Sequence, residues 1–467
     1  MSTTRLTAFA LSGILGSLAI PACDLDVSDL NNPSLADLQN NPTAISIGAA
    51  CTGLLAGNRR NHAAENGYVV LLGVLGREAY NFDQADPRYV DELLAGTLDQ
   101  GSPYGGNFWA LPYANIRLAN VVLDALDKVD DLTDENKTAI RGFAHTIIAL
   151  DLLEVIVTHD TNGAVIETDR DPLADLPPIA DRDHTYAEIV RLLDAGNTEL
   201  AAGGTTLPFA LSKGFSGFDT PATFALFNRA MRARVAAYLG AYGDVLSALE
   251  DSFINDDPAT ADFNAGVYYS YSTKPGDTPN ALINPNIYIH PSVEMDAQKN
   301  LADVVDARFL RKVGTPKQPG TSGQRSATLA FNKLYPDPEA SVAAIRNEEL
   351  ILLKAEALFA TGMVGPAVAE LNIVRTGSGR LEPLTGTPDQ ATWVDELLYE
   401  RRYSLLFEGH RWIDVRRLNK LATLPIFVTM NDDGTTTPDT LNVRFPIPLA
   451  ECDARPGELA CTKGSTD

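Results

Sequence analysis

The sequence predicts a mainly α-helical fold built from helix pairs, with a loop-rich second half and small β-hairpins. Three observations lead to this prediction. Apolar residues recur at helical spacing from residue 43 onwards, two segments share a helix–turn–helix layout, and three long stretches carry no periodic pattern. The chain has 467 residues, 45% of them apolar and 21% charged, which is typical of a globular protein with a large core.

Helical signals are clearest in four segments. In ANIRLANVVLDALDKV, Ile116 and Leu126 share one apolar face, and the segments that begin TDENK, HTYAE and TPATF continue the pattern. Thr220 is a predicted N-cap, and Pro221 suits the first helical turn because it needs no hydrogen bond from its nitrogen. Gly240 ends this helix, and a second one follows directly.

Two segments look alike. AAYLGAYGDVLSALE and AEALFATGMVGPAVAELN each contain a helix that ends in small and aromatic residues, a short glycine turn and a second helix with alanines facing back. This layout resembles the tetratricopeptide helix–turn–helix unit, and two further helix pairs between residues 115 and 200 are more degenerate copies. The helical part is therefore predicted to be an α-α superhelix of such pairs.

Long irregular segments lie between the helical blocks, at residues 81–109, 262–294 and 312–340. Loops of this length inside a compact protein are usually functional or disordered, and the tyrosine, phenylalanine and asparagine content of the first two argues against disorder. Near the C-terminus, IFVTMNDDGTTTPDTLNVRFPIP predicts a hairpin that turns at Asp433 and Gly434.

The first 22 residues predict a signal peptide. MSTTR is positively charged, LTAFALSGILGSLAI is apolar but too short for an ordinary membrane span, and IPAC ends at Cys23. A cysteine at this place is typical of a bacterial lipoprotein signal, and a plain secretory cleavage site is the alternative. Cys23 would then carry acyl chains such as palmitate, and several chains anchor a protein stably. Residues 23–42, rich in Asn, Asp and Pro, are the predicted tether.

Three further cysteines remain. Cys452 and Cys461 bracket a Pro-Gly loop in CDARPGELAC and are predicted to form a disulfide, because exported proteins meet oxidising conditions. Cys51 lies in an Ala- and Gly-rich helical stretch and is expected to be a small buried hydrophobic residue.

Charge and motifs exclude several functions. A formal net charge of −24 disfavours nucleic acid and a polybasic membrane surface. The six histidines form no HExxH motif, and GFSGF does not match the GxSxG nucleophile pattern. The Asp-rich stretches THDTNGAVIETDRDP and MNDDGTTTPD make structural calcium conceivable, but they lack EF-hand spacing, so solvated turns are favoured. No pair of carboxylates stands out as a glycosidase pair.

Several motifs together resemble the SusD/RagB family of outer-membrane nutrient-binding lipoproteins. RNEELILLKAEALFATG, AVAELNIVRTGSG, LLYERRYSLLFEGHRWIDVRRL and FPIPLAE occur in this order, and FWALPYANIRLANVVL, RGFAHTIIALDLLEVIV and TPATFALFNRAMRARVAAYLGAYGDV resemble the family's earlier helices. The resemblance covers nearly the whole mature chain, so residues 43–467 are expected to form a single SusD-like domain. The chain is shorter than many members.

The resemblance implies a fold, a location and a partner. Four tetratricopeptide-like helix pairs would form a scaffold beneath a loop-rich half. The protein would be lipid-anchored in the outer membrane, facing the cell exterior. It would pass a glycan, or in some members a peptide, to a TonB-dependent barrel of the SusC type without catalysis. A surface-tethered hydrolase and a helical scaffold without a small ligand are the alternatives.

The segment from Leu397 to Arg417 holds five arginines against three acidic residues. One hypothesis makes it a catalytic or anion-binding cluster, and the other makes it an internally paired structural network. The structural hypothesis is favoured because the local charge is nearly balanced and Asp414 lies three residues before Arg417. The residues assigned to this network are Arg401, Arg402, Glu408, Arg411, Trp412 and Asp414.

Ligand contacts are predicted in the first two irregular segments. Neutral sugars stack on aromatic faces and bond their hydroxyls to Asn, Asp and Arg, and loops on rigid scaffolds carry such sites. The candidates in the first segment are Phe82, Asp83, Tyr89, Tyr104 and Asn107. Those in the second are Tyr268, Tyr269, Tyr271 and Tyr288. The alternative is that these aromatics cover the helical core or face the barrel partner. Trp109 and Trp412 are expected in the core.

Overall fold

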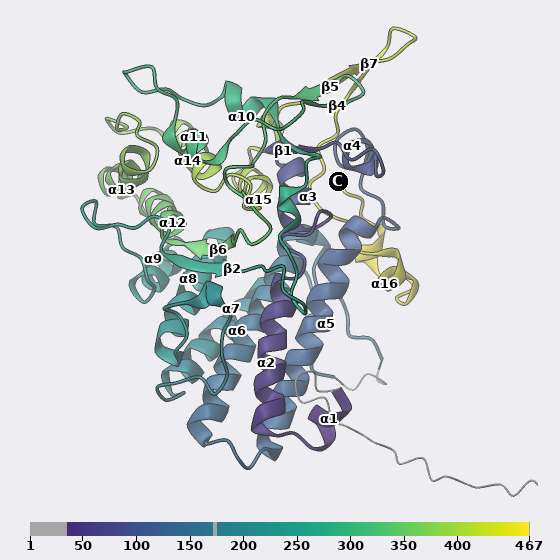
Figure 1. Cartoon of the computed structure of the whole chain (residues 1–467), viewed down its shortest axis with the longest axis vertical. Coiled ribbons are helices and arrows are strands. Elements are labelled where there is room, and N and C mark those ends of the chain that lie inside the picture. The colour runs from purple at the N-terminus through teal and green to yellow at the C-terminus, as the bar shows by residue number, and fades with distance from the viewer. Residues whose placement is uncertain (1–34, 171–174, 467) are drawn as a thin grey trace, which may run out of the picture.

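The computed structural model describes residues 35–170 and 175–466, and within them four helix pairs form the scaffold, which in Figure 1 runs from the lower half to α12 and α13 at the upper left. Successive helices contact one another, so the pairs stack into one continuous layer. The pairs are α2 (Ala44–Arg59) with α5 (Pro103–Ala125), α6 (Asp134–His159) with α7 (Arg182–Ala201), α8 (Pro221–Leu239) with α9 (Tyr242–Glu250), and α12 (Asn347–Ala360) with α13 (Val364–Gly377). The predicted mainly α-helical, helix-pair fold is confirmed. The signal peptide and Cys23 lie outside the described residues.

The ends of α8 follow from local chemistry. The hydroxyl of Thr220 accepts a hydrogen bond from the amide of Thr223, whose own hydroxyl accepts one from the amide of Thr220. Gly240 ends the helix with φ of 70°, a left-handed conformation that glycine adopts at little cost. The predicted boundaries of this helix are confirmed.

Close helix packing depends on small residues where α6 meets α7. A Cβ atom on Gly142 would come within 2.8 Å of the carbonyl oxygen of Gly196, and one on Gly196 would come within 2.9 Å of the Thr146 hydroxyl. Asn228 of α8 donates a 2.8 Å hydrogen bond to that same hydroxyl. Three helices are thereby tied together at one point of the scaffold.

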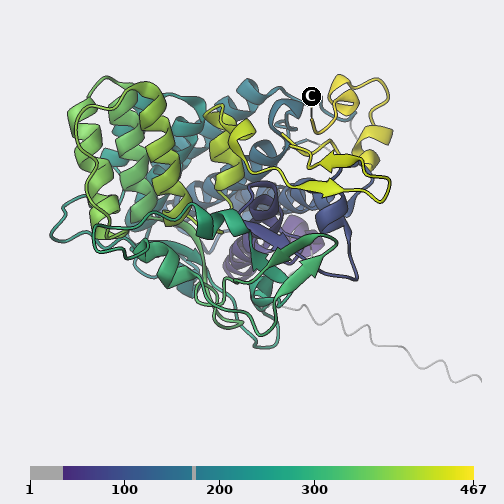
Figure 2. The same cartoon turned by 90° about the horizontal axis from the view of Figure 1, so that it is seen from above.

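The loop-rich half lies over the scaffold and contains short antiparallel strand pairs (Figures 1 and 2). These are β1 (Ala79–Asn81) with β3 (Ile287–Ile289), β2 (Gly266–Tyr269) with β6 (Val342–Arg346), β4 (Gly320–Ser322) with β5 (Arg325–Ala327), and β7 (Val428–Met430) with β8 (Thr436–Pro438). The last pair is the predicted hairpin, in which Gly434 has φ of 81°. Its Asp433 accepts hydrogen bonds from the amide and hydroxyl of Thr435.

Further helices fasten the chain ends and the loops to the scaffold. They are α1 (Leu35–Asn40), α3 (Tyr68–Leu75), α4 (Arg88–Asp91), α10 (Pro291–Met295), α11 (Ala307–Lys312), α14 (Gln390–Ser404), α15 (Arg411–Arg417) and α16 (Leu449–Asp453). Helix α1 falls within the predicted tether, and its Leu38 is buried, so this part of the tether packs on the scaffold. In the part of the chain that the structure covers, no helix is both long and apolar enough to cross a bilayer.

A disulfide joins Cys452 to Cys461, as the sequence predicts, with 5.6 Å between the two Cα atoms. The side chain of Gln100 donates a 2.8 Å hydrogen bond to the carbonyl of Cys461, which fixes the disulfide loop next to the start of α5. Cys51 is fully buried, as expected, and burial raises the pKa of its thiol.

Two buried carboxylates lie where α2, α5 and α6 meet. Asp151 accepts hydrogen bonds of 2.7 Å from both Asn58 and Asn115. Glu154 accepts one of 3.3 Å from Asn61 and lies 3.8 Å from Nδ1 of His62. Burial raises the pKa of Asp151 to about 7 and that of Glu154 to about 8, and it lowers the pKa of His62 to about 3. Glu154 and His62 are therefore both neutral at pH 7 and form no ion pair.

The raised pKa of Glu154 makes stability depend on pH. Between its ordinary pKa of 4.5 and about 8 the native state holds a proton that the unfolded chain has lost, so stability falls as pH rises through this window. We expect Glu154→Gln, which keeps an oxygen for Asn61 and offers a donor to His62, to remove this dependence. At pH 9 the variant should exceed the wild type by on the order of 3 kcal/mol, and at pH 4 the two should be similar. Denaturant unfolding at both pH values measures the difference, and parallel pH profiles would contradict the assignment.

Candidate functional site

The Arg-rich segment from Leu397 to Arg417 is folded into the interior as the end of α14 and the whole of α15. Arg401 donates a 2.8 Å bond to Asp414, and Arg417 bonds both Asp414 and Glu356. Burial alone would raise the pKa of Asp414, but Arg401 and Arg417 lower it to about 2, so this carboxylate stays ionised. The predicted pairing of Asp414 with Arg417 is confirmed, at 2.9 Å.

The other members of the segment also bond protein groups, although Glu408 and His410 border a small cavity of about 50 Å³ inside the protein. Arg402 reaches Asp296 and the hydroxyl of Ser292, both at 2.7 Å. The Arg411 guanidinium donates to the carbonyl of Leu398 at 3.2 Å, and Glu408 pairs with Arg346 at 3.0 Å and with Lys312 at 3.2 Å. The indole nitrogen of Trp412 donates to the carbonyl of Asn442 at 2.8 Å, and the ring is fully buried, in the core as expected.

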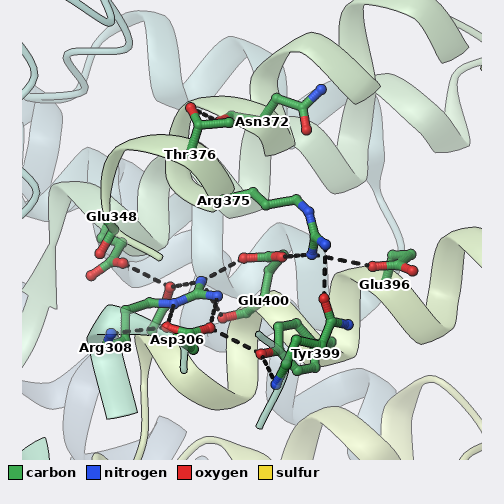
Figure 3. Close-up of polar contacts among 12 residues, drawn as sticks. Asp306, Arg308, Glu348, Asn372, Arg375, Thr376, Glu396, Tyr399 and Glu400 are labelled. Atoms are coloured by element: carbon green, nitrogen blue, oxygen red, sulfur yellow. Dashed lines mark hydrogen bonds and ion pairs between the residues drawn. The ribbon is translucent and has the colours of Figure 1, made fainter. Parts of the chain in front are cut away.

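A second group of ion pairs continues from this segment into α11 and α13, as Figure 3 shows. Arg308 has no exposed side-chain surface, and it bonds Asp306 at 2.6 Å and Glu400 at 2.5 Å. Arg375 of α13 bonds the other oxygen of Glu400 at 2.7 Å, and the hydroxyl of Tyr399 donates to Asp306 at 3.0 Å. Three segments distant in sequence are thus joined through the buried carboxylate of Glu400 and its partners. This arrangement is that of a structural network.

The first predicted ligand loop is built on buried aromatic rings. Phe82, Tyr89 and Tyr104 are 6%, 3% and 1% exposed, so little of each ring is open to a ligand. The Tyr104 hydroxyl donates a 3.0 Å bond to Asp86, and its ring lies 5.1 Å from that of Tyr89. These rings support the loop from beneath because they bury apolar area that the short strands β1 and β3 cannot cover alone.

The tyrosines predicted as ligand contacts in the second loop lie in two different places. Tyr288 is 8% exposed and its ring lies 5.6 Å from that of Phe82, so the structure brings these two predicted residues together, but in the core. The hydroxyl of Tyr269 donates to Asn58 at 3.0 Å, and that of Tyr271 to the carbonyl of Arg59 at 3.4 Å. Tyr271 is 6% exposed, so a direct ligand contact is contradicted for Tyr271 and Tyr288 alike.

The remaining predicted residues do not gather at one site. Tyr268 and Tyr269 are half-buried, and the hydroxyl of Tyr268 donates to the carbonyl of Asn264. Asn107 is half-buried on α5. Among the nine predicted ligand residues, Phe82 and Asp83 line a groove in the loop-rich half, and Tyr269 borders the small cavity beside Glu408 and His410.

This groove, of about 390 Å³, opens between the loop after β1 and the turn that joins β4 to β5. Its lining residues are Asn81, Phe82, Asp83, Gln84, Pro87, Val90, Thr321, Ser322 and Gly323. We refer to it as the loop groove. Its volume lies at the lower end of the range of small-molecule sites.

Neutral hydrogen-bonding groups dominate the loop groove. Asn81 and Asp83 order the loop, because the amide of Asp83 donates to Asn81 and one oxygen of Asp83 accepts from the amide of Ala85, both at 3.0 Å. Gln84 is exposed, and neither its amide nor the Ser322 hydroxyl bonds another described residue. Asp83 is the only carboxylate among the lining residues, so the groove suits hydroxyl-bearing ligands.

Sequence reasoning missed the 321–323 wall of the groove. The small polar turn TSGQ signals a hairpin, but it contains no residue that points to a ligand. Among the described residues, no group of three or more His, Cys, Asp or Glu side chains could hold a metal ion.

Comparisons with known proteins agree with this architecture. Residues 338–457 match the model of the SusD family. A SusD-like protein of Formosa agariphila is 29% identical over 147 residues, which make up 29% of this chain and only 29% of that relative. The resemblance to the SusD/RagB family predicted from the motifs is confirmed.

Solved structures extend the likeness to the fold of the whole described chain. A SusD-like carbohydrate-binding protein of Bacteroides fragilis superposes with a TM-score of 0.68 at 16% identity, covering 90% of this chain and 100% of that one. A SusD superfamily protein of Bacteroides vulgatus gives 0.66 at 15% identity, covering 90% and 98%. A laminarin-binding SusD-like protein gives 0.63 at 18% identity, covering 87% and 97%.

The structural assignment of the Arg-rich network leads to a stability test. We expect Arg308→Met to lower the free energy of unfolding by about 3–5 kcal/mol, because Asp306 would remain buried without a cation and Glu400 would keep only Arg375. As a control, Arg191→Met removes a mostly exposed pair with Glu188 and should change stability by less than about 1 kcal/mol. Denaturant unfolding measures both. A stable Arg308→Met protein that has lost ligand binding would show that this cluster is a site.

Proposed function

Taking the chain as a protein of the SusD family, we propose that it is a cell-surface lipoprotein that binds a neutral glycan in the loop groove. It delivers this glycan to a TonB-dependent outer-membrane transporter of the SusC type and performs no catalysis. The observation that carries the proposal is the loop groove itself, a concave site of neutral hydrogen-bonding groups in the loop-rich half.

The chemistry of the loop groove favours an uncharged ligand rich in hydroxyls. Gln84 and Ser322 offer an amide and a hydroxyl without partners of their own, and Asp83 offers an acceptor. The net charge of −24 repels polyanionic ligands but not neutral ones. Structural neighbours described as laminarin-binding and carbohydrate-binding support the same class of ligand.

A hydrolytic function is disfavoured by the lining of the groove. Most glycosidases use two carboxyl groups on either side of the scissile bond, one as the acid and one as the base or nucleophile. The loop groove has a single carboxylate, Asp83, and a second one is absent from its lining residues. A site of this kind can hold a sugar but lacks the acid–base pair that cleaves it.

The placement at the membrane rests on the sequence of the N-terminus. Cys23 at the end of the predicted signal peptide would carry the lipid, and residues 24–34 would connect it to α1 on the scaffold. A lipid anchor keeps the protein beside a transporter embedded in the same membrane. Co-purification of a large barrel protein with the tagged wild type is the direct test of that partnership.

Anchoring is tested by Cys23→Ser. The wild type should sediment with the membrane and its N-terminal peptide should carry the mass of acyl chains, because the thiol and amine of Cys23 are their attachment points. The variant should lack that mass and appear in the soluble fraction. Mass spectrometry of both proteins measures the mass of the acyl chains, and a membrane-bound, unacylated wild type would contradict the proposal.

Glycan binding is tested in the loop groove with Gln84→Ala/Ser322→Ala. The loss of two hydrogen bonds, each contributing about 1 kcal/mol, should weaken binding by roughly tenfold or more without lowering the melting temperature. Calorimetry with laminarin and other soluble neutral glycans measures the affinity. The matched control is Gln318→Ala/Ser216→Ala, which alters exposed residues outside the groove. Unchanged glycan affinity in the groove variant would place the site elsewhere.

A further inference from the structure

The loop groove carries one charged group, and that group has no cation beside it. Asp83 is half-buried and is the only charged residue in the lining. One of its oxygens accepts a 3.0 Å hydrogen bond from the amide of Ala85, which orders the loop but leaves the charge in place. Among the described residues, no lysine, arginine or histidine forms an ion pair with Asp83. The groove therefore presents an uncompensated negative charge to whatever enters it.

The acids around Asp83 add to this charge. Glu65 is half-buried next to the lining, where its carboxylate accepts a 3.5 Å hydrogen bond from Asn81. Partial burial raises the pKa of Glu65, and the charges of Asp83 and Asp86 raise it further. These carboxylates are thus close enough to repel one another, and no lysine or arginine in the described part of the chain pairs with Glu65 either.

Two guanidinium groups that flank the lining in sequence are already engaged. Arg88 donates to both oxygens of Asp86, at 2.7 and 2.9 Å. Arg325 follows the 321–323 turn, but it is buried and forms an ion pair with Asp439. Each of these cations already has a carboxylate partner, so neither is free to receive an acidic group of a ligand.

Both walls of the loop groove are held by hydrogen bonds. The side-chain amide of Gln324 donates to the carbonyl of Met430 at 2.6 Å and accepts from the amide of Met430 at 3.1 Å, which ties the 321–323 turn to β7. On the other side, the amide of Phe82 donates to the carbonyl of Asn286 at 2.9 Å. Asp83 is therefore held at the groove and cannot withdraw far from a ligand.

The size of the groove limits how far a ligand charge can lie from Asp83. A sphere of 390 Å³ is roughly 9 Å across, close to the Debye length of about 8 Å at physiological ionic strength. A charge on a ligand inside the groove is therefore poorly screened from Asp83. The rest of the net charge of −24 is spread over the whole molecule, where salt screens most of it. The local carboxylate, more than the net charge, decides whether an acidic ligand can enter.

We propose that Asp83 determines the specificity of the loop groove by excluding sugar units that carry a carboxylate or a sulfate. This inference rests on the proposed function, glycan binding in that groove. An acidic sugar would bring a second negative charge beside Asp83 with no free cation to offset it, and such like-charge contacts are how proteins reject wrong ligands. A sugar hydroxyl, in contrast, can donate a hydrogen bond to the oxygen of Asp83 that Ala85 does not use.

The test compares laminarin with laminarin whose C6 hydroxyl groups have been oxidised to carboxylates. Calorimetry on the purified full-length protein measures both affinities. The wild type should bind the neutral form at least roughly tenfold more tightly, because of the repulsion by Asp83. The methyl ester of the oxidised laminarin has the same backbone without the charge, and it should recover most of the lost affinity.

The ratio of the two affinities, neutral over oxidised, assigns the effect to Asp83. Asp83→Asn keeps an oxygen for the amide of Ala85 but removes the charge, so the ratio should fall by roughly tenfold. Thr321→Lys places a cation on the opposite wall without altering the loop that holds Asp83, and it should lower the ratio as well. The matched control is Asp130→Asn, which changes the net charge equally at an exposed site outside the groove and should leave the ratio unchanged.

The outcomes separate this inference from the proposed function. Equal affinity of the wild type for both forms, a ratio that Asp83→Asn and Thr321→Lys leave unchanged, or a fall of the ratio in Asp130→Asn as large as in Asp83→Asn would each overturn the role of Asp83. Each of these results would leave the proposed function standing if laminarin binding still depends on Gln84 and Ser322. Absence of laminarin binding, or binding that ignores Gln84 and Ser322, would instead overturn glycan binding in the groove and this inference with it.

Discussion

The structure depends on ion pairs that join buried charges of its Arg-rich network across elements distant in sequence. Arg308 and Arg375 reach the two oxygens of Glu400, and Arg417 joins Asp414 to Glu356 of α12. A buried ion costs several kcal/mol to desolvate, so each of these groups holds its partner element in place. The short two-stranded sheets of the loop-rich half could not supply that constraint, since isolated strand pairs are marginally stable.

Two buried acids of this molecule differ in their charge at pH 7. Asp414 has two guanidinium partners and stays ionised, whereas Glu154 has only Asn61 and the neutral His62 beside it and keeps its proton at pH 7. The first arrangement locks elements together over the whole physiological pH range. The second weakens as pH rises, because ionisation of Glu154 would leave a buried charge without a cation. Pairing, rather than burial alone, decides which carboxylates stabilise the fold.

The scaffold could be predicted from local sequence signals, whereas most of the candidate site could not. The N-cap at Thr220, the glycine at 240 and the Asp433–Gly434 turn depend on neighbouring residues, so they could be placed from the sequence. Whether an aromatic in a loop is buried depends on partners far along the chain, as with Phe82 and Tyr288, and burial removed most of the predicted contacts. The wall at 321–323 carried no local signal.

Helix α5 supports the loop groove from its first turn. Tyr104 bonds Asp86 and so holds the loop that forms one side of the groove. The helix has 23 residues and is about 34 Å long, but Pro112 in its interior removes one backbone hydrogen bond, which is a local cause of bending. The support of the loop groove therefore rests on the first turn of α5 and its bond to Asp86, and it does not require that the whole helix stay straight.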